Sequence, residues 1–189
     1  MSICKEILDE INKLNANPSG YVDTILKYKD YFEGNTLKIP GEKAGIETSE
    51  GASAYEEAAN ALKEAKYVQE LIPSKGLFNI AEDYFNSIKE VGMEKIDSLD
   101  INTSMDKFGS FIGEFYQLME SGSSSLEQIV ISFLVCDGEQ ERSYRSQLLN
   151  PNIKKLELPQ VKLAVVGIVQ LLSFQMNSKI RIIRMIQKF

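Results

Sequence analysis

The residues best suited to chemistry lie in the stretch 126–152, where an apolar run ends at Cys136, Asp137 and Gly138 and a charged segment follows. A cysteine acts as a nucleophile when a neighbouring group, usually histidine, stabilises its thiolate. The chain contains no histidine, and its other cysteine, Cys4, is far away in the sequence. Cys136 is therefore expected to be a small core residue at the end of an apolar segment.

The acidic side chains after Cys136 could bind a hard cation, because Asp137, Glu139 and Glu141 carry the oxygen ligands that calcium and magnesium prefer. The ligand spacing of a helix–loop–helix calcium site is absent, so a solvated acidic turn is expected instead. The serine-rich tract 121–125 lacks the Gly-Lys-Ser/Thr ending of a phosphate-binding loop. We expect it to be a linker that ends in a helix N-cap. No cofactor and no bound metal are predicted.

Length and composition indicate one globular domain. The chain has 189 residues, of which 43% are hydrophobic and 25% charged, and such a chain buries roughly two-thirds of its unfolded surface. Two cysteines are too few for a secreted disulfide scaffold, and the acidic N-terminus does not resemble a signal peptide. No apolar run reaches the roughly 18 residues of a membrane span. A cytoplasmic protein is the expected class.

Charge is unevenly distributed along the chain. Residues 153–189 contain seven basic side chains and one acidic side chain, Glu157, so their net charge is +6. Residues 1–152 then have a net charge of −12. The acidic body argues against general nucleic-acid binding, whereas the basic end could contact an anionic partner. The predicted partner-binding or anion-binding residues are Lys179, Arg181, Arg184 and Lys188.

The spacing of apolar residues predicts mostly helices in the first three quarters of the chain. Residues 21–32 also show helical periodicity. We expect an irregular connection over residues 37–49 and a loop over residues 94–107. Helices are expected at 2–16, 52–68, 126–135 and 143–149, with a strand as the alternative for 126–135 because of its β-branched content. A further helix is expected between Pro73-Ser74, which open it, and Gly92, which closes it, with its buried stripe between Leu77 and Ile88.

The end of the chain is β-like. Residues 161–174 and 179–186 are rich in Val, Ile and Leu and predict a hairpin of long strands, although the latter segment also fits a helix with Arg181, Arg184 and Lys188 on one stripe. The whole indicates a single α+β domain over residues 1–189 in which helices cover an antiparallel sheet. Its regions would be N-terminal helices at 2–92, a site-loop and helix region at 93–152, and the hairpin at 153–189.

Several segments, taken in order, resemble the CAP superfamily, which comprises cysteine-rich secretory proteins, antigen 5 and pathogenesis-related 1 proteins and is also called the SCP domain. The resemblance is to cysteine-poor protist members, and it implies a three-layer α-β-α sandwich with a central antiparallel sheet. Asn15 stands where the family usually has arginine. The matching segments are residues 6–13 with 16–18, Ile112-Gly113-Glu114, Asp137-Gly138, Arg145, Asn150-Pro151-Asn152 and Val165-Val166-Gly167-Ile168.

This resemblance implies a cleft with two histidines and two acidic residues that hold a divalent metal such as zinc. Tyr144 stands where one histidine would fall, and the other would fall near Leu99 in a shortened loop; Glu114 and Asp137 match the acidic positions. Only oxygen ligands then remain, and a tyrosine with an ordinary pKa of about 10 cannot replace imidazole as a base. The two carboxylates could do acid–base work if burial separated their pKa values. We expect them instead to support loop and strand ends.

The expected function is therefore a non-enzymatic, degenerate CAP-like domain that serves as a structural or adaptor subunit of an intracellular protein assembly. In the protist setting of the resemblance, the expected assembly is cytoskeletal or ciliary. The alternative is a peripheral domain that binds lipid or sterol at an anionic membrane surface through the basic end. A hydrolase or protease is the least expected class, and no nucleic-acid partner is predicted.

Overall fold

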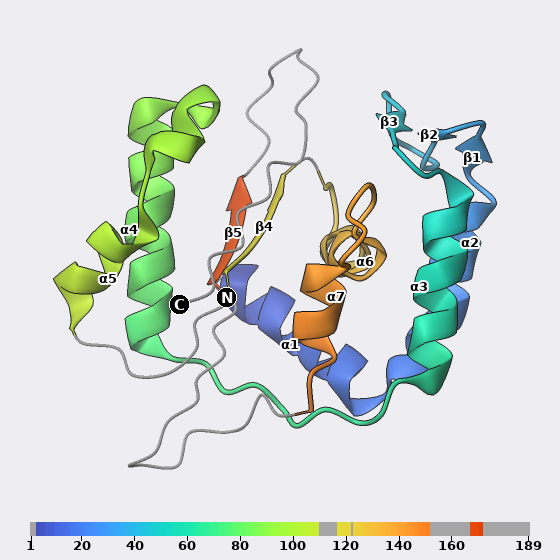
Figure 1. Cartoon of the computed structure of the whole chain (residues 1–189), viewed down its shortest axis with the longest axis horizontal. Coiled ribbons are helices and arrows are strands. Elements are labelled where there is room, and N and C mark those ends of the chain that lie inside the picture. The colour runs from blue at the N-terminus through green and yellow to red at the C-terminus, as the bar shows by residue number, and fades with distance from the viewer. Residues whose placement is uncertain (1–2, 110–116, 122, 152–166, 172–189) are drawn as a thin grey trace. The chain divides into compact units, whose positions relative to one another are not determined.

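The computed structural model describes residues 3–109, 117–121, 123–151 and 167–171 (Figure 1). These residues combine helices with short strands, so the general prediction of an α+β protein is confirmed. The chain forms two compact units. Unit 1 consists of Met1–Glu70 and Ser124–Ile153, and unit 2 consists of Leu71–Ser123 and Lys154–Phe189.

Unit 1 is built mainly from helices that pack on one another: α1 with α6, α2 with α3, and α6 with both α3 and α7. The turn after α1 is fixed by Asn17, whose side-chain oxygen accepts a hydrogen bond from the backbone N–H of Gly20 at 3.2 Å. The helices are α1 (Ile3–Ala16), η1 (Pro18–Tyr21), α2 (Val22–Lys29), α3 (Ala52–Glu64), α6 (Leu126–Val135) and α7 (Ser143–Leu148).

The predicted helix over residues 52–68 is wrong at its end. Helix α3 stops at Glu64, and the extended chain that follows places Val68 in the core, where its N–H donates to the carbonyl of Asn15 at 2.9 Å. Docking on the end of α1 thus overrides the helical preference of the segment.

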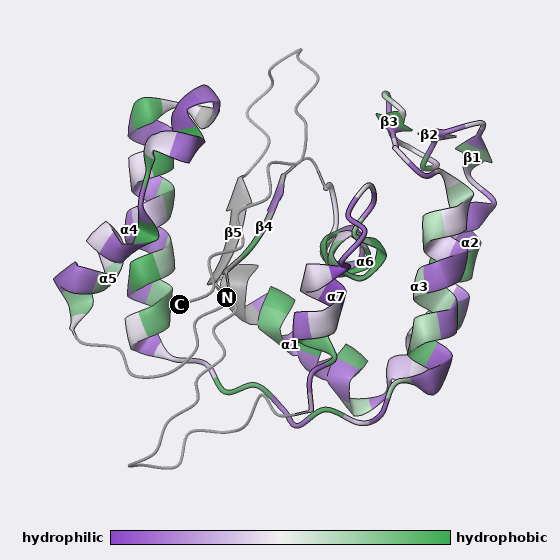
Figure 2. Cartoon of the chain, in the orientation of Figure 1, coloured by the Kyte–Doolittle hydropathy of each residue, from purple (hydrophilic) through white to green (hydrophobic). Residues whose placement is uncertain are grey.

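Helix α6 is the most buried helix of unit 1: seven of its ten residues are buried. Figure 2 shows it nearly end-on, with its visible ribbon mostly in the green of hydrophobic residues. Ser125 caps it by accepting from the N–H of Gln128, whose side chain accepts in turn from the N–H of Ser125. This reciprocal capping box starts a helix and has no counterpart in a strand. The helix prediction is confirmed.

A small antiparallel sheet follows α2, with the strand order β1-β2-β3. Strand β1 (Phe32–Glu33) pairs with β2 (Thr36–Leu37), and β2 pairs with β3 (Ile46–Glu47). The predicted irregular connection over 37–49 therefore contains two short strand pieces. The Phe32 ring lies edge-on to Tyr55 of α3, with ring centroids 5.2 Å apart.

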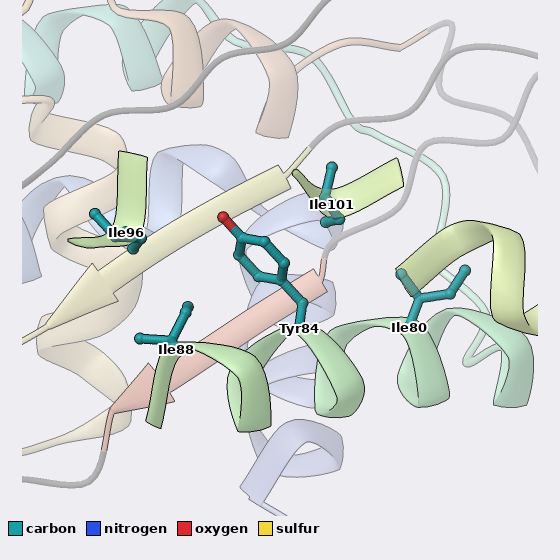
Figure 3. Packing of buried hydrophobic residues seen from close by; sticks show 5 residues of the cluster. All are labelled: Ile80, Tyr84, Ile88, Ile96 and Ile101. Atoms are coloured by element: carbon teal, nitrogen blue, oxygen red, sulfur yellow. The ribbon is translucent and has the colours of Figure 1, made fainter. Parts of the chain in front are cut away.

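Unit 2 is organised around α4 (Lys75–Val91), one face of which carries Ile80, Tyr84 and Ile88 toward Ile96 and Ile101 (Figure 3). The last two residues belong to η2 (Met93–Ser98) and α5 (Ile101–Phe108). The predicted loop over 94–107 is therefore wrong. The two isoleucines are too sparse to give a period, but their burial against α4 and the Asp100 N-cap fix the helical turns.

Two strands complete the described part of unit 2. Strand β4 (Gln117–Ser121) pairs in parallel with β5 (Gly167–Leu171), and α4 packs close to β5. The predicted strand over 161–174 is thus seen at its centre, but its observed pairing with β4 is parallel, where an antiparallel sheet was predicted. The predicted partner over 179–186 lies outside the described residues. Within the described ranges, no helix combines the length and apolar character needed to cross a membrane.

Candidate functional site

The structure places two of the predicted site residues, Asp137 and Tyr144, in unit 1 around the connection between α6 and α7. The third predicted site residue, Glu114, lies outside the described residues. The predicted partner-binding residues Lys179, Arg181, Arg184 and Lys188 lie outside them as well. The geometry of the site is therefore built from the α6–α7 connection and from what it contacts.

Asp137 supports the start of α3. Its carboxylate accepts hydrogen bonds from the backbone N–H groups of Ser49 at 2.7 Å and Glu50 at 2.9 Å, just before the helix begins. The N-terminal end of a helix carries unpaired N–H groups and partial positive charge, so a carboxylate there is favourable. Burial, and secondarily the charge of Asp137, raise the pKa of Tyr55 on the same helix.

Replacing Asp137 by alanine is expected to lower the free energy of unfolding by about 1–2 kcal/mol, because two N–H groups lose a charged acceptor. Equilibrium urea unfolding checks this. The matched control is Glu141→Ala, which removes an exposed carboxylate from the same segment. Equal urea midpoints for the two variants would show that the Asp137 bonds contribute nothing to stability.

Tyr144 is a core residue. Its side chain is only 4% exposed, and its ring stands perpendicular to that of Phe133 on α6, with centroids 5.5 Å apart. Edge-to-face pairs of this kind add to the free energy of burying the rings. Tyr144 therefore joins α7 to α6.

Two arginines next to Tyr144 form an ion-pair network with α3 that sequence reasoning did not find. Arg142 contacts the Glu57 carboxylate through Nη2 at 2.6 Å and the Glu50 carboxylate through Nη1 at 2.7 Å. Arg145 also pairs with Glu57. No local signal links residues 85 or more positions apart in the sequence, so the pairing could not have been found from a motif.

The same arginines close the C-terminal end of α6. Arg142 donates from Nη1 to the carbonyl of Cys136 at 2.8 Å, and Arg145 donates from Nη1 to the carbonyl of Leu134 at 3.2 Å. Cationic groups are favourable at this end of a helix because its last carbonyls lack partners. The hydrogen bond from Arg142, and then that from Arg145, hold the pKa of Glu57 below its ordinary value.

Cys136 is unsuited to nucleophilic chemistry in this conformation. Its thiol is buried and donates to the carbonyl of Phe133 at 2.9 Å. Burial raises the pKa of the Cys136 thiol, which disfavours the reactive thiolate. The prediction that Cys136 is a small core residue is confirmed.

The described residues contain no candidate metal site. Nowhere among them do three or more His, Cys, Asp or Glu side chains lie close enough together to bind a metal ion. The carboxylates around the α6–α7 connection bond instead to N–H groups and guanidinium groups. Their arrangement stabilises the fold around the α6–α7 connection.

Comparison with known proteins adds no further identification: no family model, no curated protein and no solved structure matches the chain. The CAP resemblance accordingly rests on the motifs of the sequence.

Proposed function

We propose that the chain is a non-enzymatic, degenerate CAP-like domain with a three-layer α-β-α architecture, and that it serves as a structural or adaptor subunit of a protein assembly. A cytoskeletal or ciliary assembly is the setting that the protist resemblance favours. The proposal rests mainly on one observation: Asp137 and Tyr144 make contacts that stabilise unit 1. Asp137 accepts two backbone hydrogen bonds, and the Tyr144 ring packs against Phe133.

A side chain that acts on a substrate must be able to reach it. Both oxygens of Asp137 accept backbone N–H groups, and the Tyr144 ring is enclosed by the core. Arg145 is likewise bound to Glu57 and to the carbonyl of Leu134. The positions that would form the reactive cleft in the family are therefore used here to join α3, α6 and α7.

The partner is proposed to be an acidic protein that contacts the basic end of the chain. Residues 153–189 carry a net +6, in contrast to −12 over the rest. Opposite charges steer association and set its specificity, and their effect weakens as salt screens them. An anionic membrane surface, with or without bound sterol, is the second candidate because the same charges favour it.

The test is affinity isolation of the full chain from its source cells, followed by native mass spectrometry. A stoichiometric partner protein is expected, and its recovery should fall as salt is raised. The charge-reversal variant replaces by glutamate all four predicted contact residues, Lys179, Arg181, Arg184 and Lys188, and is expected to lose the partner.

A matched control reverses four charges elsewhere and is expected to keep the partner; its substituted lysines are exposed in the structure, namely Lys27, Lys43, Lys66 and Lys95. Phosphatidylserine vesicles are offered to the same three proteins in a sedimentation assay. A chain that stays monomeric without a partner contradicts the adaptor role. Binding to vesicles alone would assign the basic end to lipid instead.

A further inference from the structure

The connection between α6 and α7 contains a segment with no apolar side chain. We call residues 137–142 (Asp-Gly-Glu-Gln-Glu-Arg) the polar clasp. The helices on either side are held by buried apolar residues, among them Val135 and Tyr144. The clasp differs from these two helices because polar contacts, rather than apolar packing, hold it in place.

Those contacts join the clasp to the first half of α3 and to the turn before it. Asp137 accepts from the N–H groups of Ser49 and Glu50, and Arg142 pairs with Glu50 and Glu57. Backbone bonds close two turns inside the clasp, from Glu139 N–H to Cys136 carbonyl and from Arg142 N–H to Glu139 carbonyl. Segments held by few apolar contacts open at a lower free energy than the whole fold.

Cys136, the residue just before the clasp, and Arg142, the last residue of the clasp, have left-handed backbone conformations. Cys136 has φ 50° and ψ 47°, and Arg142 has φ 46° and ψ 43°. These are the non-glycine residues with positive φ among the described residues. This conformation is unfavourable for residues with a Cβ, so opening relieves an unfavourable backbone state at each end.

We propose that the polar clasp opens locally, with Cys136 and Arg142 as hinges, and that the Glu57 carboxylate holds it closed. Glu57 is suited to this role because it accepts from both Arg142 and Arg145. Opening is expected to expose Cys136, which directly precedes the clasp in the chain and is 5% exposed in the closed form. The reactivity of this thiol therefore reports how often the clasp opens.

The test measures alkylation of Cys136 by iodoacetamide in the full chain, with peptide mass spectrometry separating it from Cys4. Glu57→Gln keeps the shape of the side chain and removes its charge, so it is expected to raise the Cys136 rate roughly tenfold. The matched control is Glu56→Gln, because Glu56 neighbours Glu57 on α3 and pairs with Lys29 rather than with the clasp. Equal rates in the two variants would overturn the role of Glu57.

A urea series on the unsubstituted chain decides whether the opening is local. Local opening exposes little surface, so the Cys136 rate is expected to stay nearly constant at low urea, far below the unfolding midpoint. A rate that rises from the first addition of urea with the full slope of global unfolding would overturn the proposal. This measurement holds even if Glu57→Gln fails to fold, which circular dichroism reveals.

Discussion

Replacing Tyr144 by alanine is expected to lower the free energy of unfolding by about 3–5 kcal/mol, the usual range for deleting a buried aromatic ring. The ring is enclosed in unit 1 and stands perpendicular to Phe133. Its removal leaves a cavity between α6 and α7 and takes away the ring contact. Urea unfolding followed by circular dichroism measures the loss.

Tyr67→Ala is the matched control, because Tyr67 also belongs to unit 1 but is 63% exposed. It is expected to change stability by about 0.5 kcal/mol or less. Tyr144→His is expected to fall between the two alanine variants, since the smaller polar ring fills less of the core. If Tyr144→Ala were as stable as Tyr67→Ala, the ring would not support the fold and could serve another purpose.

Replacing Tyr84 by alanine is expected to have a comparable effect on unit 2, about 3–5 kcal/mol. Tyr84 is 1% exposed and shares a cluster with Ile80, Ile88, Ile96 and Ile101. Because Ile96 and Ile101 hold η2 and α5 to α4 through this cluster, the backbone amides of α5 should lose protection from hydrogen exchange. Urea unfolding and exchange mass spectrometry report the two effects.

The control for Tyr84 lies on the same helix: Phe78→Ala removes an aromatic ring that is 40% exposed. A loss well below that of Tyr84→Ala is expected because less surface is buried there. Similar losses at the two positions would mean that the described cluster does not form the core of unit 2.

Local sequence patterns predicted the strongly apolar helices better than the short helical turns of η2 and α5. For Leu126–Val135, apolar content alone left helix and strand open, and the contacts between Ser125 and Gln128 decide the matter. Residues 94–107 lack periodicity, yet Ile96 and Ile101 order them by packing against α4. Burial against a distant element is a tertiary effect that a local window does not contain.

In the candidate site, too, the sequence predicted local features but not the contacts between distant segments. The sequence predicted Asp137 as a supporting carboxylate, but it could not identify Ser49 and Glu50 as the donors, 88 and 87 positions away. The pairing of Arg142 with Glu57 was missed for the same reason. Long-range polar contacts depend on how the helices pack. The spacing of charged residues along the chain therefore does not predict them.

Hydrogen exchange at the backbone amides of Ser49 and Glu50 tests most directly whether Asp137 supports the fold. The hydrogen bonds at 2.7 and 2.9 Å predict slow exchange for both amides in the unsubstituted chain. Asp137→Ala should speed both by roughly tenfold or more, whereas Glu141→Ala should leave them slow. Exchange at the rate of an unfolded peptide in the unsubstituted chain would contradict the supporting role and leave the Asp137 carboxylate available for chemistry.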